Sequence, residues 1–429
     1  MAFASIQLGN PHTAILMTQQ QASDPPKARP PTEQSAVPVS HPVPVFASPV
    51  HFLTATAEIE ALAEALKRVS RFAVDMESDS FYHYFDKVCL FQITAAGEDY
   101  IVDALSGADL SSLHGVFADP AIEKIFHGAD NDIMLLKRSC GINTRGIFDT
   151  MIAAQIAGLR KLGLSDLIGQ YFSRRLDKRF QRYDWSSRPL LPEHLQYARS
   201  DTHYLAELRD RLWDLVIEKG RASQALEEFE RVTLKNPQVK PFSADDCLKI
   251  AGSQTLAAAD LKVLRELFVA RDAIARKEDL PTFRVIQNEV LLNLVRLKPT
   301  QVKDLLGVRS MHPRVVRNYG EQIVGAIRTG MSSQALLPKP PAEPPAPVDA
   351  AEIEARFQKL KKWRQGKSVL LDLEPALIAS NAILYNVARI LPADLPQMME
   401  IPLVRRWQVD AYGAEWLAAL AATESDRNH

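Results

Sequence analysis

The chain has few cysteines and no long apolar run, and each shortage excludes a class of protein. Only three cysteines occur among its 429 residues, and they form no CxxC pair and no Cys/His spacing typical of zinc ligands. We therefore expect a reducing compartment and no zinc site. The first 26 residues contain no Lys or Arg, so the basic segment of a signal peptide is missing, and no run of about 18 apolar residues occurs. These features predict a cytoplasmic protein without a membrane-spanning segment.

Net charge is lacking as well, because 51 Lys and Arg residues are balanced by 52 Asp and Glu residues. Any affinity for nucleic acid must therefore come from local basic patches rather than from overall charge. Apolar residues make up 46 % of the chain and charged residues 24 %, which is close to the average for soluble globular proteins. The length predicts two or three folded domains.

Proline is abundant in two segments, which divide the chain. Residues 1–50 hold nine of the 27 prolines, and such a segment buries too little apolar surface to offset the entropy lost on ordering. A second segment, LPKPPAEPPAPVD at 337–349, has the composition of an extended spacer. The expected parts are a disordered Pro-rich tail (1–48), an α/β domain (49–222), a connector (223–250), a helical domain (251–332), a Pro-rich linker (333–350) and a second helical domain (351–424).

The pattern after residue 70 predicts a mixed sheet flanked by helices. Three short β-rich runs, RFAVDME, VCLFQITAA and DYIVDAL, are followed by an alternation of strand and helix in KIFHGA, NDIMLLKRSC and GIFDT. One long helix is then expected from residue 193 to a Gly stop at Gly220.

The region after residue 251 reads as all-helical, and it repeats. At an offset of 93 residues, VIQNEVLLNLVRLKP aligns with LIASNAILYNVARILP, so that Asn288 matches Asn381 and Arg296 matches Arg389. Two small helical modules of one kind are the prediction, and chance similarity between amphipathic helices is the alternative.

Two carboxylates are predicted to share one face of the first β-rich run. Asp75 and Glu77 alternate with Phe72, Val74 and Met76, so both acids point to the same side of the strand. Neighbouring like charges repel one another unless a cation binds between them. Taken alone, the pair leaves two alternatives open, a metal site and a solvated edge strand.

Acidic residues at two further places in the chain are also candidates for such a metal site. Asp130 lies where a helix N-cap is expected and Asp132 lies in the first turn, and both positions suit an acid even without a ligand. On the long helix, Tyr197 and Asp201 are four residues apart and therefore share a face. A carboxylate in an aromatic stripe needs a cation or hydrogen-bond donors when it is buried.

The runs VDMESD, FHGADNDIMLL and YARSDTHYL resemble the three motifs of the DEDDy 3′-5′ exonucleases, specifically those of the ribonuclease D family and its eukaryotic exosome-associated relatives. The segment DWSSRPLLPEHLQ before the third motif strengthens the resemblance, which covers about residues 51–220. It implies a ribonuclease H-like exonuclease domain in which Asp75, Glu77, Asp132 and Asp201 bind metal and Tyr197 is the motif tyrosine. Gln196 stands where the histidine subtype has its histidine. The two helical modules resemble HRDC domains, the second more loosely.

The resemblance implies an activity, a cofactor and a partner. The expected protein is a 3′-5′ exoribonuclease that trims single-stranded 3′ ends of RNA, such as transfer-RNA precursors, to 5′-mononucleotides. Two Mg²⁺ or Mn²⁺ ions, or other divalent cations, would serve a two-metal hydrolysis, and carboxylate oxygens suit such hard ions. No nucleotide cofactor is expected, and the oligomeric state is left open. A 3′-5′ DNA exonuclease acting in repair and an inactive nucleic-acid-binding scaffold are the alternatives.

Substrate contacts are predicted near the motifs. Phe81 and Tyr84 follow the first motif and can stack on bases, and His127 with Gly128 can approach the terminal nucleotide. Core packing is the alternative for the aromatic residues, and a glycine needed only for the turn is an equal alternative for Gly128. The basic run SRRLDKRFQR can bind phosphates, with a solvated charged face as the alternative, and the first helical module, with 13 basic and 8 acidic side chains over 260–330, is a second candidate. Asp130 falls where relatives need no acid and Asp79 adds a carboxylate in a loop where none is expected, so both are left outside the site.

Overall fold

The computed structural model describes residue 46 and residues 50–236, 241–334 and 349–421. Apart from Phe46, the Pro-rich tail expected at 1–48 lies outside the described residues, as does most of the linker expected at 333–350. No helix of the described part is long and apolar enough to cross a bilayer.

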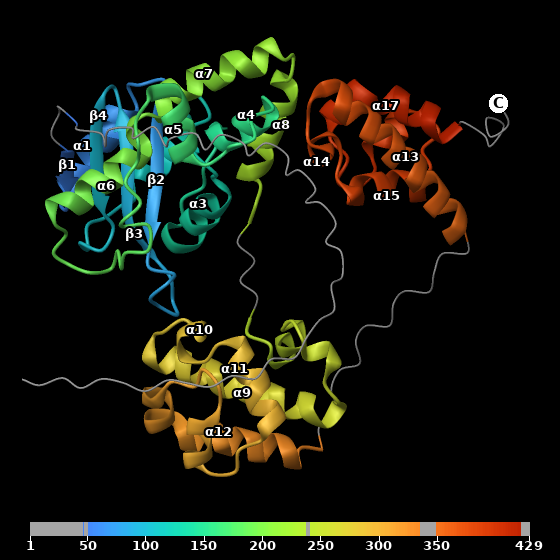
Figure 1. The fold of residues 1–429 in the computed structure, drawn as a ribbon. Helices are drawn as coiled ribbons and strands as arrows, with labels where there is room; N and C mark the ends of the chain where they lie inside the picture. The colour runs from blue at the N-terminus through green and yellow to red at the C-terminus, as the bar shows by residue number, and fades with distance from the viewer. Residues whose placement is uncertain (1–45, 47–49, 237–240, 335–348, 422–429) are drawn as a thin grey trace, which may run out of the picture. The chain divides into compact units, whose positions relative to one another are not determined.

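A six-stranded mixed sheet forms the centre of the first domain (Figure 1). The strand order is β1-β4-β3-β2-β5-β6, with antiparallel pairing of β3 to β2 and β4 and parallel pairing elsewhere. The expected mixed α/β fold is therefore confirmed, and β1 is a strand that the sequence pattern did not indicate. The strands are β1 (Val50–Leu53), β2 (Arg71–Ser78), β3 (Val88–Ala95), β4 (Glu98–Asp103), β5 (Glu123–Phe126) and β6 (Ile147–Asp149).

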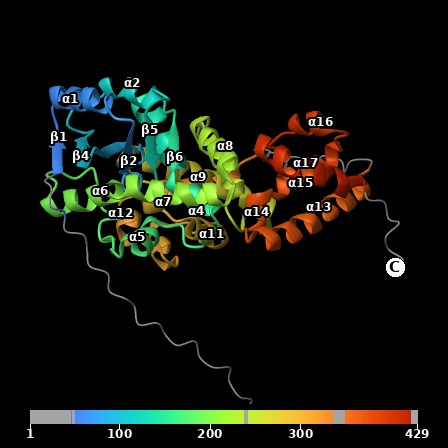
Figure 2. The ribbon, with the colours of Figure 1, turned by 90° about the horizontal axis from the view of Figure 1, so that it is seen from above.

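Helices cover both faces of this sheet, as Figure 2 shows for α1 and α2 on one side and α6 and α7 on the other. Phe72 points to the first side, where its ring meets Phe117 of α2 at 5.5 Å between centroids. Asp75 and Glu77 point to the opposite side, toward α6. The helices of this domain are α1 (Thr56–Leu66), α2 (Ser112–Ala118), α3 (Asp130–Leu135), α4 (Thr150–Ile156), α5 (Leu164–Phe172), α6 (Pro192–His203), α7 (Leu205–Glu218) and α8 (Ala222–Thr233).

Two expectations about these helices were wrong. The single helix expected from residue 193 to Gly220 is divided into α6 and α7 at Tyr204, whose backbone (φ −95°, ψ −6°) departs from helical values. The ring of Tyr204 packs against Phe172 of α5, which holds the break in place. The connector expected at 223–250 begins with α8, which buries Phe229 and Val232 in the core of the first domain.

Two helical domains follow, and the repeat of 93 residues holds in three dimensions. Helices α11 and α15 begin at Asn288 and Asn381, which are 93 residues apart. In each copy an arginine of the preceding long helix donates to this asparagine, Arg271 to Asn288 at 2.7 Å and Arg364 to Asn381 at 2.8 Å. The first copy contains α9 (Ala258–Glu278), α10 (Thr282–Val285), α11 (Asn288–Leu297) and α12 (Pro313–Ser332), and the second contains α13 (Ala350–Leu371), α14 (Pro375–Ile378), α15 (Asn381–Ile390), α16 (Leu395–Met399) and α17 (Arg406–Ala421).

Candidate active site

Carboxylates from distant parts of the chain meet on the α6 side of the sheet. Asp75, Glu77 and Asp201 each offer an oxygen atom, and these atoms all lie within 4.8 Å of one another. Strand alternation places Asp75 and Glu77 two residues apart on one face of β2, and α6 crosses that face. All three side chains are partly buried. The acids that the sequence placed in two separate motifs thus form one cluster.

Asp132 acts on the same cluster from the first turn of α3. Burial raises the pKa of its carboxyl well above the ordinary value, and the charge of Asp75 raises it further. The charge of Asp132 likewise adds to the raised pKa of Glu77. The neighbouring acid, Asp130, is excluded from the cluster because it pairs with Lys235. Asp130 is also the first helical residue rather than the expected N-cap, which is Ala129.

Mutual repulsion and burial make these acids hard to ionise without a cation. Burial raises the pKa of Asp75 to about 6. The pKa of Glu77 is raised by burial first and then by its three acidic neighbours, and that of Asp201 by burial and by Asp75. A cluster built only from carboxylate oxygens suits hard divalent cations such as Mg²⁺ and Mn²⁺. The residues present therefore fit the metal that the motifs imply.

Tyr197 lies one helical turn before Asp201 and is held between aromatic rings. Its side chain is 7 % exposed, and its ring lies 5.8 Å from Trp185 and 5.7 Å from Phe180, measured between centroids. Burial raises the pKa of its phenol above the ordinary value, and the charges of Asp201 and Glu77 raise it further. The phenol therefore stays protonated at neutral pH and can donate a hydrogen bond.

The segment before α6 is fixed by an ion pair that the sequence patterns did not single out. Arg188 Nε donates to Asp103 Oδ2 at 2.8 Å, and its Nη1 donates to the carbonyl of Trp185 at 2.7 Å. Asp103 ends β4, so the pair ties this segment to the sheet and positions Trp185 against Tyr197. The Asp-Trp and Arg-Pro-Leu residues that contributed to the resemblance thus support the motif tyrosine.

The loop after β2 carries two of the predicted substrate-binding residues. Phe81 is 53 % exposed, whereas the Tyr84 hydroxyl donates to Asp272 Oδ1 of α9 at 2.7 Å. Asp79 is fully buried, forms an ion pair with Lys87 at 2.6 Å and accepts the Lys87 backbone N–H. The unexpected acid at position 79 therefore closes this loop and does not face the carboxylate cluster.

The other two predicted residues form the turn between β5 and α3. His127 Nδ1 lies 2.9 Å from Thr150 Oγ1, and burial lowers its pKa. Gly128 has φ +80°, a conformation that favours glycine, and an added Cβ would meet the Met151 side chain at 3.2 Å. The turn leads directly into the helix that carries Asp132.

Asp149, which the sequence patterns did not single out, organises this turn. Its buried carboxylate accepts hydrogen bonds from the backbone N–H groups of Gly128 (3.0 Å), Ala129 (2.8 Å), Met151 (2.8 Å) and Ile152 (3.1 Å). It thereby caps α4 and fastens the start of α3 to the end of β6. An aspartate directly before a helix, as in GIFDT, is an N-cap signal that would have identified it.

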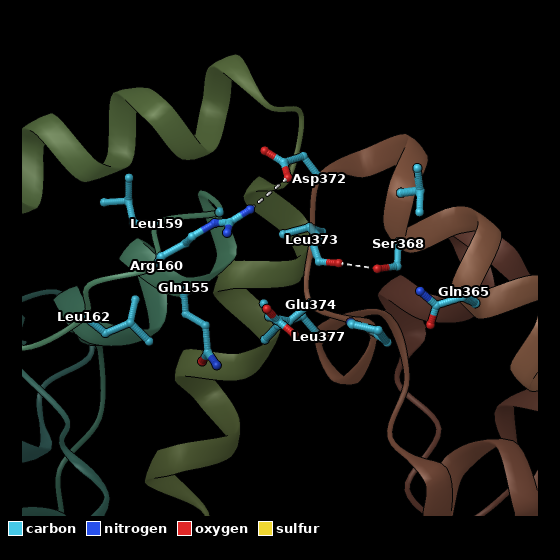
Figure 3. Close-up of a pocket in the computed structure, with 13 residues that line it drawn as sticks. Gln155, Leu159, Arg160, Leu162, Gln365, Ser368, Asp372, Leu373, Glu374 and Leu377 are labelled. Atoms are coloured by element: carbon cyan, nitrogen blue, oxygen red, sulfur yellow. Dashed lines mark hydrogen bonds and ion pairs between the residues drawn. The ribbon is translucent and has the colours of Figure 1, made fainter. Parts of the chain in front are cut away.

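A cavity of about 570 Å³ lies elsewhere, along residues 155–162 and 365–377, and is drawn in Figure 3. Its charged residues include Arg160 and Asp372, which are 3.9 Å apart and both highly exposed. An exposed pair at this distance is held only weakly. None of the predicted metal ligands lines this cavity, so the carboxylate cluster is the stronger candidate for chemistry.

The sequence matches known families over most of the described domains. Residues 50–217 match the family described as 3′-5′ exonuclease, and residues 260–327 and 353–420 both match the HRDC domain. The chain therefore contains a DEDD-type 3′-5′ exonuclease domain followed by two HRDC domains, as the sequence motifs predicted.

Named relatives are similar to this chain over both kinds of domain or over part of them. The exosome complex exonuclease RRP6 of Saccharomyces cerevisiae is 32 % identical over 315 residues, which are 70 % of this chain and 42 % of the relative. Exosome complex component 10 of Homo sapiens is 33 % identical over 282 residues, which are 64 % of this chain and 32 % of the relative. The chain thus matches less than half the length of either relative.

Two solved structures share the fold of this chain. The catalytic core of RRP6 from Trypanosoma brucei superposes with a TM-score of 0.62 at 28 % identity, covering 69 % of this chain and 83 % of that one. Ribonuclease D of Escherichia coli superposes with a TM-score of 0.63 at 20 % identity, covering 87 % and 99 % of the two chains. The second match extends the fold similarity to a larger share of this chain, 87 % against 69 %.

Proposed function

We propose that this chain is a 3′-5′ exoribonuclease that shortens single-stranded RNA ends by metal-dependent hydrolysis. The observation that carries the proposal is the meeting of Asp75, Glu77 and Asp201 within 4.8 Å, with Tyr197 one turn before Asp201. The relative at 32 % identity is named an exosome complex exonuclease, and the Escherichia coli protein with the same fold is named an exoribonuclease, which supports RNA as the substrate.

The carboxylates would hold two divalent cations, Mg²⁺ or Mn²⁺, through Asp75, Glu77, Asp132 and Asp201. When bound, such ions activate the attacking water and stabilise the charge on the leaving oxygen. The four acids must lose their protons when the cations bind. Metal affinity should therefore rise as the pH increases past the raised pKa values of these carboxyls. The basic residues of the first HRDC domain and the run 173–182 would contribute phosphate contacts.

Tyr197 is proposed to orient the attacking water through its hydroxyl, without acting as a base. A phenol whose pKa is raised by burial and by neighbouring carboxylates does not release its proton at neutral pH. The Phe180 and Trp185 rings fix its direction.

Changing Tyr197 to Phe tests this role. We expect turnover to fall about 100-fold, the range seen when a positioned proton-handling group is removed. Mn²⁺ affinity, measured by calorimetry, should change less than about twofold, since the phenol is not a ligand. Phe180→Leu is the control for disturbed packing around the same ring, and it should cost much less turnover. Equal turnover of the Tyr197→Phe variant and the parent would remove the hydroxyl from the mechanism.

The proposed natural substrate is a transfer-RNA precursor whose 3′ extension is trimmed in the cytoplasm to the mature length. The test is to incubate the purified chain with such a precursor in Mg²⁺ or in EDTA and to resolve the products at single-nucleotide resolution. Stepwise shortening with release of 5′-mononucleotides only in Mg²⁺ is expected. A DNA oligonucleotide of the same sequence runs in parallel. Faster digestion of the DNA would indicate a DNA exonuclease, and intact substrates in every lane would indicate an inactive binding scaffold.

A further inference from the structure

Gln92 is a buried amide that lacks a hydrogen-bond partner in the part of the chain that the structure describes. It lies on β3 and is fully buried, yet among the described residues neither its Oε1 nor its Nε2 has a partner. The two atoms are both unpaired, so exchanging their positions by flipping the amide does not satisfy either one. A buried amide that makes no hydrogen bond lowers stability, and such groups in proteins usually have a specific reason.

The strand register places Gln92 beside the carboxylate cluster. Gln92 lies directly opposite Asp75 in the antiparallel pair of β3 and β2. Residues paired in this way point to the same face, with Cβ atoms about 4.5–5.5 Å apart. The amide of Gln92 therefore points to the face that carries Asp75 and Glu77.

The neighbours of Gln92 on the same face show what lies above it. Two residues before it, Leu90 packs in one cluster with Tyr197 and Ala198 of α6. Two residues after it, Thr94 Oγ1 donates to Thr202 Oγ1 of α6 at 2.8 Å. Gln92 therefore lies beneath the turn of α6 between Ala198 and Thr202. This turn carries Asp201.

An amide in this place is matched to ionised carboxylates. A carboxylate that binds a cation through one oxygen keeps the other oxygen as an acceptor, and a neighbouring donor fixes its orientation. Arg and Lys would also donate, but their positive charge would compete with the cation for the same oxygens. A neutral donor orients the ligand and leaves its charge available to the metal.

We propose that Gln92 is a positioning residue of the metal centre, whose amide N–H donates to the Asp75 carboxylate when that carboxylate binds a divalent cation. The inference rests on the proposed metal-dependent function of the same cluster. It assigns to Gln92 the Asp75 carboxylate as a partner, in the orientation that a bound cation would impose on that carboxylate.

The test is the Gln92→Met variant, which keeps the length of the side chain and removes both polar atoms. Mn²⁺ affinity is measured by calorimetry and the melting temperature is measured in EDTA. We expect Mn²⁺ affinity to fall about 10-fold or more. The melting temperature in EDTA should stay equal to that of the parent or rise, because an unpaired buried amide has been removed. Gln92→Leu repeats the test with a branched side chain in case Met packs poorly.

Thr144→Val is the matched control. Thr144 is 2 % exposed and its Oγ1 also lacks a partner among the described residues, but it does not belong to the carboxylate cluster. It should show the stability effect in EDTA and no change in Mn²⁺ affinity. Unchanged Mn²⁺ affinity in both Gln92 variants would overturn the inference and leave the proposed function standing. A parent chain that binds no Mn²⁺ would instead overturn the proposed function.

Discussion

Replacing Asp75 by Asn is expected to abolish most of the activity and to stabilise the metal-free protein. Turnover on a short RNA should fall about 1000-fold, equivalent to roughly 4 kcal/mol of transition-state stabilisation. Asp75 lies within the group of oxygen atoms that could hold the cation, and an amide oxygen carries no charge to bind it. In EDTA the same substitution removes one of several repelling carboxylates, so the free energy of unfolding should rise by roughly 1–3 kcal/mol at pH 8.

The stabilisation should depend on pH in a defined direction. The folded-state pKa of Asp75 is raised to about 6 from an ordinary value near 3.8, mainly by burial. A carboxyl with a raised pKa supports the folded state while it is protonated, and this support is lost as the pH rises through about 6. Asn cannot ionise, so the advantage of the variant in EDTA should be larger at pH 8 than at pH 5, as measured by thermal unfolding.

Asp130→Asn is the control, because Asp130 pairs with Lys235 and lies outside the cluster. Its turnover should match that of the parent. An Asp75→Asn variant that retained turnover within tenfold, or that melted lower than the parent in EDTA at pH 8, would contradict the assignment of Asp75 to a metal-binding cluster.

Replacing Asp149 by Ala is expected to lower the free energy of unfolding of the exonuclease domain by about 3–5 kcal/mol. The carboxylate is 1 % exposed and accepts four backbone N–H groups, which a methyl group would leave without partners. The measurement is urea unfolding followed by tryptophan fluorescence. Turnover should fall as well, since the turn at Gly128 and Ala129 sets the start of the helix that carries Asp132.

Asp149→Asn tests how much of this stability depends on the hydrogen-bond acceptors. It keeps one oxygen acceptor and should recover part of the stability that Asp149→Ala loses. Asp130→Ala is the control: at an exposed ion pair, it should change the free energy of unfolding by less than about 0.5 kcal/mol. A loss below about 1 kcal/mol in Asp149→Ala would show that the four hydrogen bonds do not hold the turn in place.

Strands β2 to β6 and the acids of the carboxylate cluster were predictable because their signals are local. Alternation over residues 71–77 indicated a strand with Asp75 and Glu77 on one face, and the structure has β2 there. The spacing of four between Tyr197 and Asp201 indicated a shared helix face, and both lie on α6. The repeat of 93 residues was equally readable, because amphipathic periodicity and the positions of Asn288 and Asn381 are properties of the chain itself.

Other features depend on partners far away in the sequence. The break between α6 and α7 lies at Tyr204, whose ring packs against Phe172 of α5. The sequence around it contains no Gly or Pro that would have predicted the break. The membership of α8 in the first core depends on where Phe229 is buried. The exclusion of Asp79 from the cluster follows from its ion pair with Lys87.

By itself, the amino-acid sequence determined the exonuclease and HRDC domains, their order and the acids available to bind a cation, because motif spacing and periodicity follow from neighbouring residues. Only the tertiary structure decided that Asp75, Glu77 and Asp201 approach within 4.8 Å, that Asp149 fastens the turn before Asp132, and that Gln92 lies opposite Asp75 without a hydrogen-bond partner among the described residues. The physical reason is that electrostatic repulsion and the cost of an unsatisfied polar group depend on distance and burial, and these arise when separate segments pack together.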